Sequence, residues 1–350
     1  MDAVLTCMVD EKIGPGELNT RLIQSVKDFF PCAGAVALRS PGIALRYALA
    51  SLELPEKSTI LISALAPSWQ ILAVEQLGYV PAVLDVDENT GLVTPEAVSV
   101  GIKEGGRLLL LHETMGILPD MNEMLALGIP VIEDVSQSAG AVFYGEPAES
   151  VSGGGSEQHD GSPAPAGKKA GTFGIFTILG LEEHDSITGG GGAVLLAPGR
   201  RDWVVLKKNT DTAPAIDLLP DINSALAWVQ LREFQKNETV RKEIFSLYQR
   251  SLLSGRCKTY MREPDDGSAA SLFPVIISGS YKDVRQYAER KDIEVRQAYA
   301  DSVIALRNEE LAPGCRQAQS LLLRCVLFPL YPRLGKTQTL KIAKVLGTLP

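Results

Sequence analysis

The sequence has 350 residues, of which 45% are hydrophobic and 22% are charged, and its formal net charge is -8. This composition is typical of a globular protein and excludes a disordered or fibrous chain. The negative charge argues against nucleic acid or an anionic membrane surface as a partner. Because we find neither a signal sequence nor a run of about 18 apolar residues, we expect a soluble, cytoplasmic protein.

The cysteines and histidines give no signal for a disulfide framework or a metal site. The five cysteines are Cys7, Cys32, Cys257, Cys315 and Cys325. Their odd number and the absence of a C-x-x-C spacing predict free thiols in a reducing compartment. The three histidines are too far apart in the sequence to suggest metal ligands.

The first part of the chain alternates predicted strands with predicted helices. Helical spacing and capping residues predict helices at 18–30, 41–54, 69–77, 94–102 and 120–127. Short apolar runs predict buried strands at 35–38, 59–63, 82–86, 108–112 and 130–133. This alternation predicts an α/β fold with a mostly parallel central sheet that is covered on both faces.

A Gly-, Ser- and Pro-rich stretch at 150–167 interrupts the alternation and predicts a disordered surface loop, in which His159 is solvated. Order returns at 175–179, before a glycine run at 189–192 and a strand at 193–196.

The last third of the chain predicts a smaller α/β unit. A helix is expected to start at Asp221 and to continue, bent or broken, towards Arg250. Further elements are a strand at 272–277, a helix at 282–290, a strand at 293–296, the apolar run 324–329 and a helix at 337–346. We therefore predict a large domain at 1–220 and a smaller C-terminal domain at 221–350.

The first candidate functional residue is Asp134. It ends a short apolar strand, follows Glu133, and is itself followed by small residues. Open α/β sheets bind their ligands at the carboxyl ends of parallel strands. An acidic side chain at such a position therefore predicts a functional site.

A set of short segments, in order, carries a resemblance that covers nearly the whole chain. The segments are GPGE at 14–17, GYVP at 78–81, DVD at 85–87, HETMG at 112–116, DM at 120–121, IED at 132–134 with Gln137 and Gly140, ALAWVQL at 225–231 with Arg241, and FPLYP at 328–332. With these segments the chain resembles the DegT/DnrJ/EryC1/StrS sugar aminotransferases.

The resemblance implies a pyridoxal phosphate (PLP)-dependent transferase of fold type I, with PLP or pyridoxamine phosphate as its cofactor. It further implies amino transfer to a keto-sugar nucleotide, a nucleotide-sugar substrate, and a homodimer with active sites at the subunit interface. No nucleic-acid or membrane partner is implied.

The resemblance also implies roles for individual residues. Asp134 would pair with the pyridine nitrogen of PLP, and Gln137 would donate a hydrogen bond to its phenolic oxygen. Ser40 and Gly42 would belong to the turn that holds the phosphate, and Trp69 lies near the position of the aromatic residue that stacks on the ring. The alternatives are that Asp134 and Gln137 only cap a strand end and that Trp69 belongs to the core.

The chain departs from the family pattern at the Schiff-base lysine, which precedes the glycine run. Residues 180–189 read GLEEHDSITG and contain no lysine. Counting forward from Gly174 places Asp185 at the lysine position, whereas counting back from Gly192 places His184 there. His184 and Asp185 are therefore the candidate catalytic residues.

The phosphate contacts depart from the pattern as well. Pro41 has no N–H group to offer a phosphate, and the second phosphate-binding serine of the family falls near Gly180. Lys168, Lys169, Lys207 and Lys208 are more simply explained as solvated charges than as replacements for the missing lysine.

Three functional hypotheses follow from these observations. The chain is an aminotransferase in spite of the missing lysine, or it resembles the sugar 3-dehydrases of the family and uses pyridoxamine phosphate with His184 as the base. In the third hypothesis it is a non-catalytic homologue that acts as a structural or regulatory dimer. Loss of the lysine together with both phosphate contacts favours the third.

Overall fold

The computed structural model describes residues 2–145, 167–262 and 267–350. The stretch predicted to be a disordered loop at 150–167, with His159, lies outside the described residues except for Gly167. Within the described ranges, no helix is both long and apolar enough to cross a membrane.

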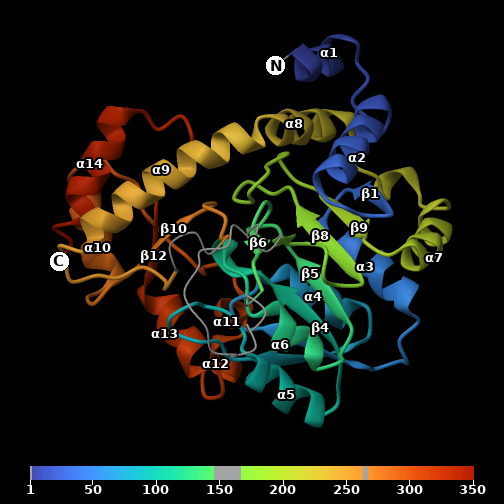
Figure 1. Cartoon of the computed structure of the whole chain (residues 1–350), viewed down its shortest axis with the longest axis horizontal. Coiled ribbons are helices and arrows are strands. Elements are labelled where there is room, and N and C mark those ends of the chain that lie inside the picture. The colour runs from blue at the N-terminus through green and yellow to red at the C-terminus, as the bar shows by residue number, and fades with distance from the viewer. Residues whose placement is uncertain (1, 146–166, 263–266) are drawn as a thin grey trace, which may run out of the picture.

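A seven-stranded sheet forms the centre of the molecule, with strand order β1-β9-β8-β5-β4-β2-β3 (Figure 1). Its strands are β1 (Gly34–Leu38), β2 (Thr59–Ser63), β3 (Val80–Leu84), β4 (Gly106–His112), β5 (Val131–Asp134), β8 (Phe176–Gly180) and β9 (Ala193–Ala197). The strands from β3 to β8 in this order pair in parallel, whereas β9 runs antiparallel to both of its neighbours. The prediction of an α/β fold with a mostly parallel central sheet is confirmed.

Helices cover both faces of this sheet, as the alternation of the sequence predicts. They are α2 (Glu17–Phe29), α3 (Pro41–Leu52), α4 (Trp69–Gln76), α5 (Pro95–Lys103), α6 (Met121–Ala126), α7 (Arg200–Thr210) and α8 (Asp221–Arg232). The helix α1 (Asp2–Val9) lies outside this layer and packs against α8. Strand β4 shows why two covered faces are needed. Leu108 and Leu110 pack into one buried cluster, and Leu109 and Leu111 pack into another.

A second, three-stranded sheet has the order β10-β12-β11. The elements around it are α9 (Phe234–Leu252), β10 (Phe273–Ile276), α10 (Tyr281–Glu289), β11 (Arg296–Gln297), α11 (Val303–Leu306), α12 (Asn308–Leu311), α13 (Arg316–Arg324), β12 (Cys325–Phe328) and α14 (Lys336–Leu346). It has a hydrophobic core of its own, built mainly by α9, β10, β12 and α14. The predicted domain boundary at 220 precedes α8 and stays a prediction.

Two long helices join the regions of the two sheets. In Figure 1, α8 and α9 follow one another along the top of the molecule, from α2 towards α14. The predicted helix from Asp221 is indeed broken, because Glu233 leaves the helical conformation between α8 and α9.

Four short elements complete the chain: the strands β6 (Val142–Phe143) and β7 (Lys168–Lys169), and the 3-10 helices η1 (Thr114–Gly116) and η2 (Ala215–Asp217). The strand predicted at 293–296 overlaps the observed strand, β11, only at Arg296. The α-helices that sequence reasoning missed are α1, α7, α11, α12 and α13.

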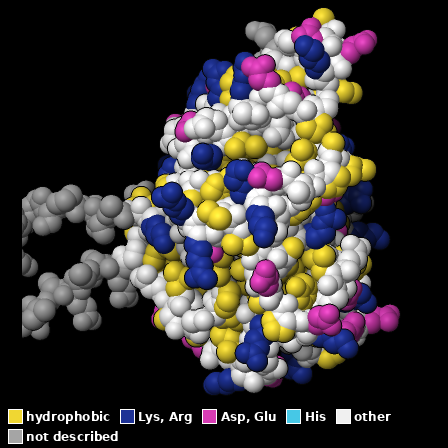
Figure 2. Space-filling model, turned by 90° about the vertical axis from the view of Figure 1, so that its right-hand side faces the viewer, with side chains coloured by type: hydrophobic (Ala, Val, Ile, Leu, Met, Phe, Trp, Pro, Cys, Tyr) yellow, Lys and Arg dark blue, Asp and Glu magenta, His cyan; other side chains and the backbone are white. Residues whose placement is uncertain are grey.

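The net negative charge does not gather on the face shown in Figure 2. Lys and Arg side chains are spread there among acidic, hydrophobic and neutral ones.

Candidate active site

A cavity of about 1020 Å³ lies where loops of the large sheet meet the segment that follows β11. Its wall includes six of the seven predicted site residues: Ser40, Gly42, Trp69, Gln137, His184 and Asp185. The structure thus brings together side chains that are up to 145 positions apart in the sequence, from Ser40 to Asp185. The roles that the resemblance implies for them stay predictions.

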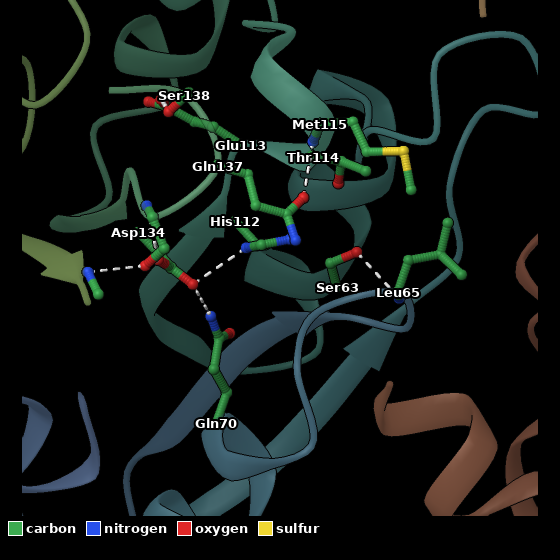
Figure 3. A network of polar contacts seen from close by, with 12 residues as sticks. Ser63, Leu65, Gln70, His112, Glu113, Thr114, Met115, Asp134, Gln137 and Ser138 are labelled. Carbon is green, nitrogen blue, oxygen red and sulfur yellow. Dashed lines mark hydrogen bonds and ion pairs between the residues drawn. The ribbon is translucent and has the colours of Figure 1, made fainter. Parts of the chain in front are cut away.

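Asp134, the seventh predicted residue, is fully buried behind this wall (Figure 3). Its Oδ2 atom accepts a hydrogen bond from Gln70 Nε2 at 2.7 Å and lies 3.0 Å from Nδ1 of His112. Its Oδ1 atom accepts from the backbone N–H of Ser136 at 3.2 Å and from the Ser136 hydroxyl. A carboxylate has about four acceptor positions, and all four are used within the protein.

These contacts also fix the charge of Asp134. Burial alone would raise its pKa, but the hydrogen bonds and charge of His112 and the hydrogen bonds of Ser136 hold the pKa below its ordinary value. Asp134 is therefore an ionised, fully satisfied carboxylate.

His112 is a residue of the site that sequence reasoning missed. It ends β4 directly beside Asp134 in the parallel register and lines the cavity, although the residue is only 2% exposed. An ionised carboxylate can only accept, so Nδ1 of His112 donates its hydrogen to Asp134. Within the described residues, Nε2 has no hydrogen-bond partner. The signal in the sequence was a polar residue at the end of the strand that precedes β5.

Gln137 is held from one side only. Its Oε1 atom accepts a hydrogen bond from the backbone N–H of Met115 at 2.8 Å, which fixes the orientation of the amide (Figure 3). Because Gln137 lines the cavity, its Nε2 group can donate to a ligand there.

Asp185 lies against the floor of the cavity. Its Oδ2 atom accepts from the backbone N–H of Glu182 at 2.7 Å. Burial, followed by the charges of Asp134 and Glu182, raises the pKa of Asp185 to about 8. At neutral pH, Asp185 is therefore mostly an uncharged carboxylic acid.

The same side chain excludes a serine from position 180. A Cβ atom on Gly180 would come within 2.4 Å of Asp185 Oδ2 and within 2.6 Å of Ser136 Oγ. The place near which the resemblance puts a second phosphate contact is thus filled by Asp185 and Ser136.

His184 lies beside Asp185 but is exposed, and it lines the cavity in the same loop as Glu182 and Glu183. Partial burial and the nearby charge of Arg296 lower the pKa of His184, so that the imidazole is neutral at pH 7.

Ser40 serves the first turn of α3. Its hydroxyl accepts from the backbone N–H of Ile43 at 3.2 Å, and its carbonyl accepts from the N–H of Ala44 at 3.1 Å. This is the arrangement of a helix N-cap, with Pro41 as the first helical residue. Of the turn predicted to hold a phosphate, the backbone N–H groups of Ser40 and Gly42 have no partner in the described structure.

Trp69 is the first residue of α4 and is half-buried. It packs against the buried cluster of α3, α4 and the large sheet, and it also lines the cavity. Both interpretations of Trp69, as a core residue and as a ring at the site, thus correspond to contacts it makes.

No lysine is among the described residues that line the cavity, where Arg296 supplies the permanent positive charge. The other lysines considered are engaged elsewhere. Lys169 donates to the carbonyl of Phe29 at 3.0 Å, and Lys207 pairs with Asp211 at 2.6 Å. In the described parts of the chain, no three His, Cys, Asp or Glu side chains gather as metal ligands.

The model of the DegT/DnrJ/EryC1/StrS aminotransferase family matches residues 1–201 and 217–347. The chain belongs to this family.

Solved structures of low sequence identity share the fold. DesV from S. venezuelae, in complex with a ketimine intermediate, is 16% identical with a TM-score of 0.83, and the match covers 99% of this chain and 93% of that one. An aminotransferase from Psychrobacter cryohalolentis is 16% identical with a TM-score of 0.82, covering 99% and 95%. A mutant of GDP-4-keto-6-deoxymannose-3-dehydratase (ColD), with bound GDP-perosamine, is 15% identical with a TM-score of 0.80, covering 99% and 96%.

The residues of this cavity do not fit PLP. Among the described residues, the cavity wall offers no amine for a covalent bond to the cofactor, and the acceptors of Asp134 are already filled. Ser40 caps its own helix, Pro41 has no N–H, and Asp185 fills the space beside Gly180.

Proposed function

We propose that this chain is a family member that does not perform PLP-dependent amino transfer and keeps its cavity as a cofactor-independent ligand site. The observation that carries this proposal is Asp185. At one of the two positions where the resemblance can place the amine of a lysine, the cavity has a carboxylic acid whose pKa is raised to about 8. A carboxylic acid cannot form the imine through which such enzymes hold their cofactor.

The hydrogen bonds around Asp134 support the same proposal. To reach this carboxylate, a protonated pyridine nitrogen would have to displace the amide of Gln70 or the ring of His112. The side chain of Gln70 is fully buried, and its Oε1 atom already has no hydrogen-bond partner. Displacing its Nε2 group from Asp134 would leave both polar atoms of the amide without a partner.

Cofactor retention tests the proposal. The purified protein is incubated with PLP or with pyridoxamine phosphate and passed through gel filtration, and the visible spectrum of the protein peak is recorded. We expect neither cofactor to remain with the protein. Retention of PLP with a shifted absorption band would contradict the proposal.

A matched pair of variants controls this experiment. Asp185→Lys places an amine in the cavity, whereas Asp211→Lys places one on the surface, where Asp211 is exposed. Adduct formation in both variants alike would reveal only non-specific labelling. Retention in Asp185→Lys alone would show that the cavity can still admit the cofactor when an amine is present.

One observation favours a second candidate, the use of pyridoxamine phosphate with His184 as the base. His184 lines the cavity and is neutral at pH 7. This candidate predicts that pyridoxamine phosphate is retained without being trapped by borohydride and that any turnover is lost in His184→Asn. Loss of pyridoxamine phosphate on gel filtration would exclude it.

We further propose a homodimer and a nucleotide sugar as a ligand. The family resemblance supports the homodimer, and one structural relative, ColD, is described with bound GDP-perosamine. Light scattering at several concentrations tests the dimer, and calorimetry with a GDP-sugar tests the ligand.

A further inference from the structure

Three polar groups on the wall of the cavity have hydrogen-bonding capacity that the protein does not use. They are Nε2 of His112, Nε2 of Gln137 and Oδ1 of Asp185, and all three residues line the cavity. The other polar atoms of these side chains are each fixed by a bond to the protein, at 3.0 Å, 2.8 Å and 2.7 Å respectively. The free atoms are therefore held in place before a ligand arrives, which is the condition for catalysis by positioned groups.

His112 and Asp134 have the relation of a base and the carboxylate that orients it. Asp134 accepts the hydrogen of Nδ1, so that in the neutral ring Nε2 presents its lone pair, and the negative charge of Asp134 would stabilise the imidazolium formed when Nε2 takes a proton. Gln70 and Ser136 in turn hold Asp134. The ring of His112 is thus locked by buried neighbours.

Asp185 lies close to the pair of His112 and Asp134. Unlike Asp134, Asp185 is mostly protonated at neutral pH. A Cβ atom placed on Gly180 would lie 2.4 Å from Oδ2 of Asp185 and 2.6 Å from the hydroxyl of Ser136, so these two groups are close neighbours. The same hydroxyl bonds to Asp134. The charge of Asp134 helps to keep Asp185 protonated. Asp134 and Asp185 therefore differ in protonation at neutral pH, the first being ionised and the second mostly protonated.

We propose that this part of the cavity catalyses a cofactor-independent proton transfer, in which His112 removes a proton from a carbon next to a carbonyl group and Asp185 protonates the carbonyl oxygen. Gln137 donates a hydrogen bond to the same oxygen. The proposal rests on the proposed function, because it needs the cavity free of PLP.

The step is balanced without an oxidant or a further reactant. The C–H bond breaks, its electron pair forms the C=C bond of an enol, and the oxygen takes the proton of Asp185. His112 is then protonated and Asp185 is ionised. Where the carbon that lost its proton carries a hydroxyl group, His112 returns its proton to the former carbonyl carbon while Asp185 takes up the proton of that hydroxyl. Both side chains are then restored, and the product is an isomer in which the carbonyl and hydroxyl groups have exchanged places.

Arg296 indicates the class of substrate. It is half-buried in the wall of the cavity, and no carboxylate in the described structure forms an ion pair with it. A guanidinium in this position suits a phosphate or carboxylate group. The substrate would be an enolisable carbonyl compound with an anionic group, small enough for a cavity of about 1020 Å³.

Exchange with solvent deuterium tests the proposal. The full chain, without added cofactor, is mixed with dihydroxyacetone phosphate in D₂O, and loss of the signal of the protons next to the carbonyl is followed by proton NMR. We expect exchange above the buffer rate, at least about 100-fold slower in His112→Gln and at least about 10-fold slower in Asp185→Asn. Asp211→Asn, on the surface, should leave the rate unchanged. Exchange at the buffer rate, or equal loss in all three variants, overturns the proposal.

A second readout does not depend on turnover. Long-range ¹H–¹⁵N NMR of the ¹⁵N-labelled chain at pH 7 reports which nitrogen of His112 carries the hydrogen. The proposal requires hydrogen on Nδ1 and an unprotonated Nε2, with the preference lost in Asp134→Asn. Hydrogen on Nε2 in the unmodified chain overturns it and leaves the proposed function intact. Retention of PLP, by contrast, would defeat the proposed function, whatever the tautomer.

Discussion

Strand β5 ends in two carboxylates that serve two different regions of the molecule. Glu133 takes part in a closed region: its two oxygens accept from the backbone N–H groups of Gly171, Phe173 and Gly174, at 2.8 Å, 2.7 Å and 2.5 Å. Asp134 takes part in the region of the cavity, through His112 and Ser136. Both carboxylates are fully buried.

The difference lies in what remains free around each carboxylate. Glu133 holds only backbone, and its neighbour Glu113 bonds to the hydroxyl of Ser138, so that this region stabilises the fold. Asp134 holds a side chain, His112, that has a second polar atom and lines a cavity. A buried carboxylate at a strand end is thus a sign of function only where its partners reach a ligand space.

The largest effect is expected from breaking the closed region. Glu133→Ala leaves three backbone N–H groups, one buried and two partly buried, without acceptors, and we expect a loss of about 4 kcal/mol in the free energy of unfolding. Urea denaturation measures the loss. Glu309→Ala, which removes an exposed carboxylate, should change the value by less than about 0.5 kcal/mol. A similar, small effect of both substitutions would show that Glu133 does not organise this region.

The next effect concerns the buried acid of the closed region. Burial and the charge of Glu133 raise the pKa of Glu113 well above its ordinary value. The unfolded chain releases this proton at lower pH than the folded chain, so stability falls as the pH rises above the ordinary pKa of a glutamate. Glu113→Gln removes this dependence and should stabilise the protein at pH 7. Urea denaturation at pH 4 and pH 7 checks the sign, since the gain must shrink at pH 4.

Asp185→Asn is the matching change in the cavity. The pKa of Asp185 is raised to about 8, so the folded state loses stability as the pH rises from the ordinary pKa of an aspartate to about 8. We expect a gain of about 1.5 kcal/mol at pH 7, smaller than for Glu113 because the side chain is partly exposed. A loss of stability at pH 7 would mean that Asp185 is ionised in the folded protein.

The smallest effect is expected from Ser40→Ala. Removal of the N-cap of α3 should lower the free energy of unfolding by about 1 kcal/mol. Adding PLP should raise the melting temperature of neither the variant nor the parent. If PLP raised the melting temperature of the parent alone, Ser40 would be a phosphate ligand rather than only a cap.

The sequence predicted the scaffold well because its signals are local. The apolar runs of β2, β4, β5 and β9 and the cap signals of α3 and α5 lie within single elements, and the structure has them close to the expected positions. Helices α7 and α13 were missed because each is rich in charged and polar residues and buries only a few side chains. Their helical state depends on packing against elements far away in the chain.

The site could be predicted only in part. The positions of Ser40, Trp69, Gln137, His184 and Asp185 around one cavity followed from the family resemblance. Which of their atoms are already bonded did not, because this depends on contacts between distant segments. The bond from Gln70 to Asp134 spans 64 positions, and the approach of Asp185 to Gly180 depends on the turn between β8 and β9.

In the described structure, the cavity has no amine that can hold PLP. The most direct test of this absence is peptide mapping by mass spectrometry after incubation with PLP and reduction with borohydride. We predict that any pyridoxyl adduct falls on exposed lysines, at low occupancy, and equally in the urea-unfolded chain. A stoichiometric adduct on one lysine of the folded protein, absent from the unfolded chain, would contradict the account.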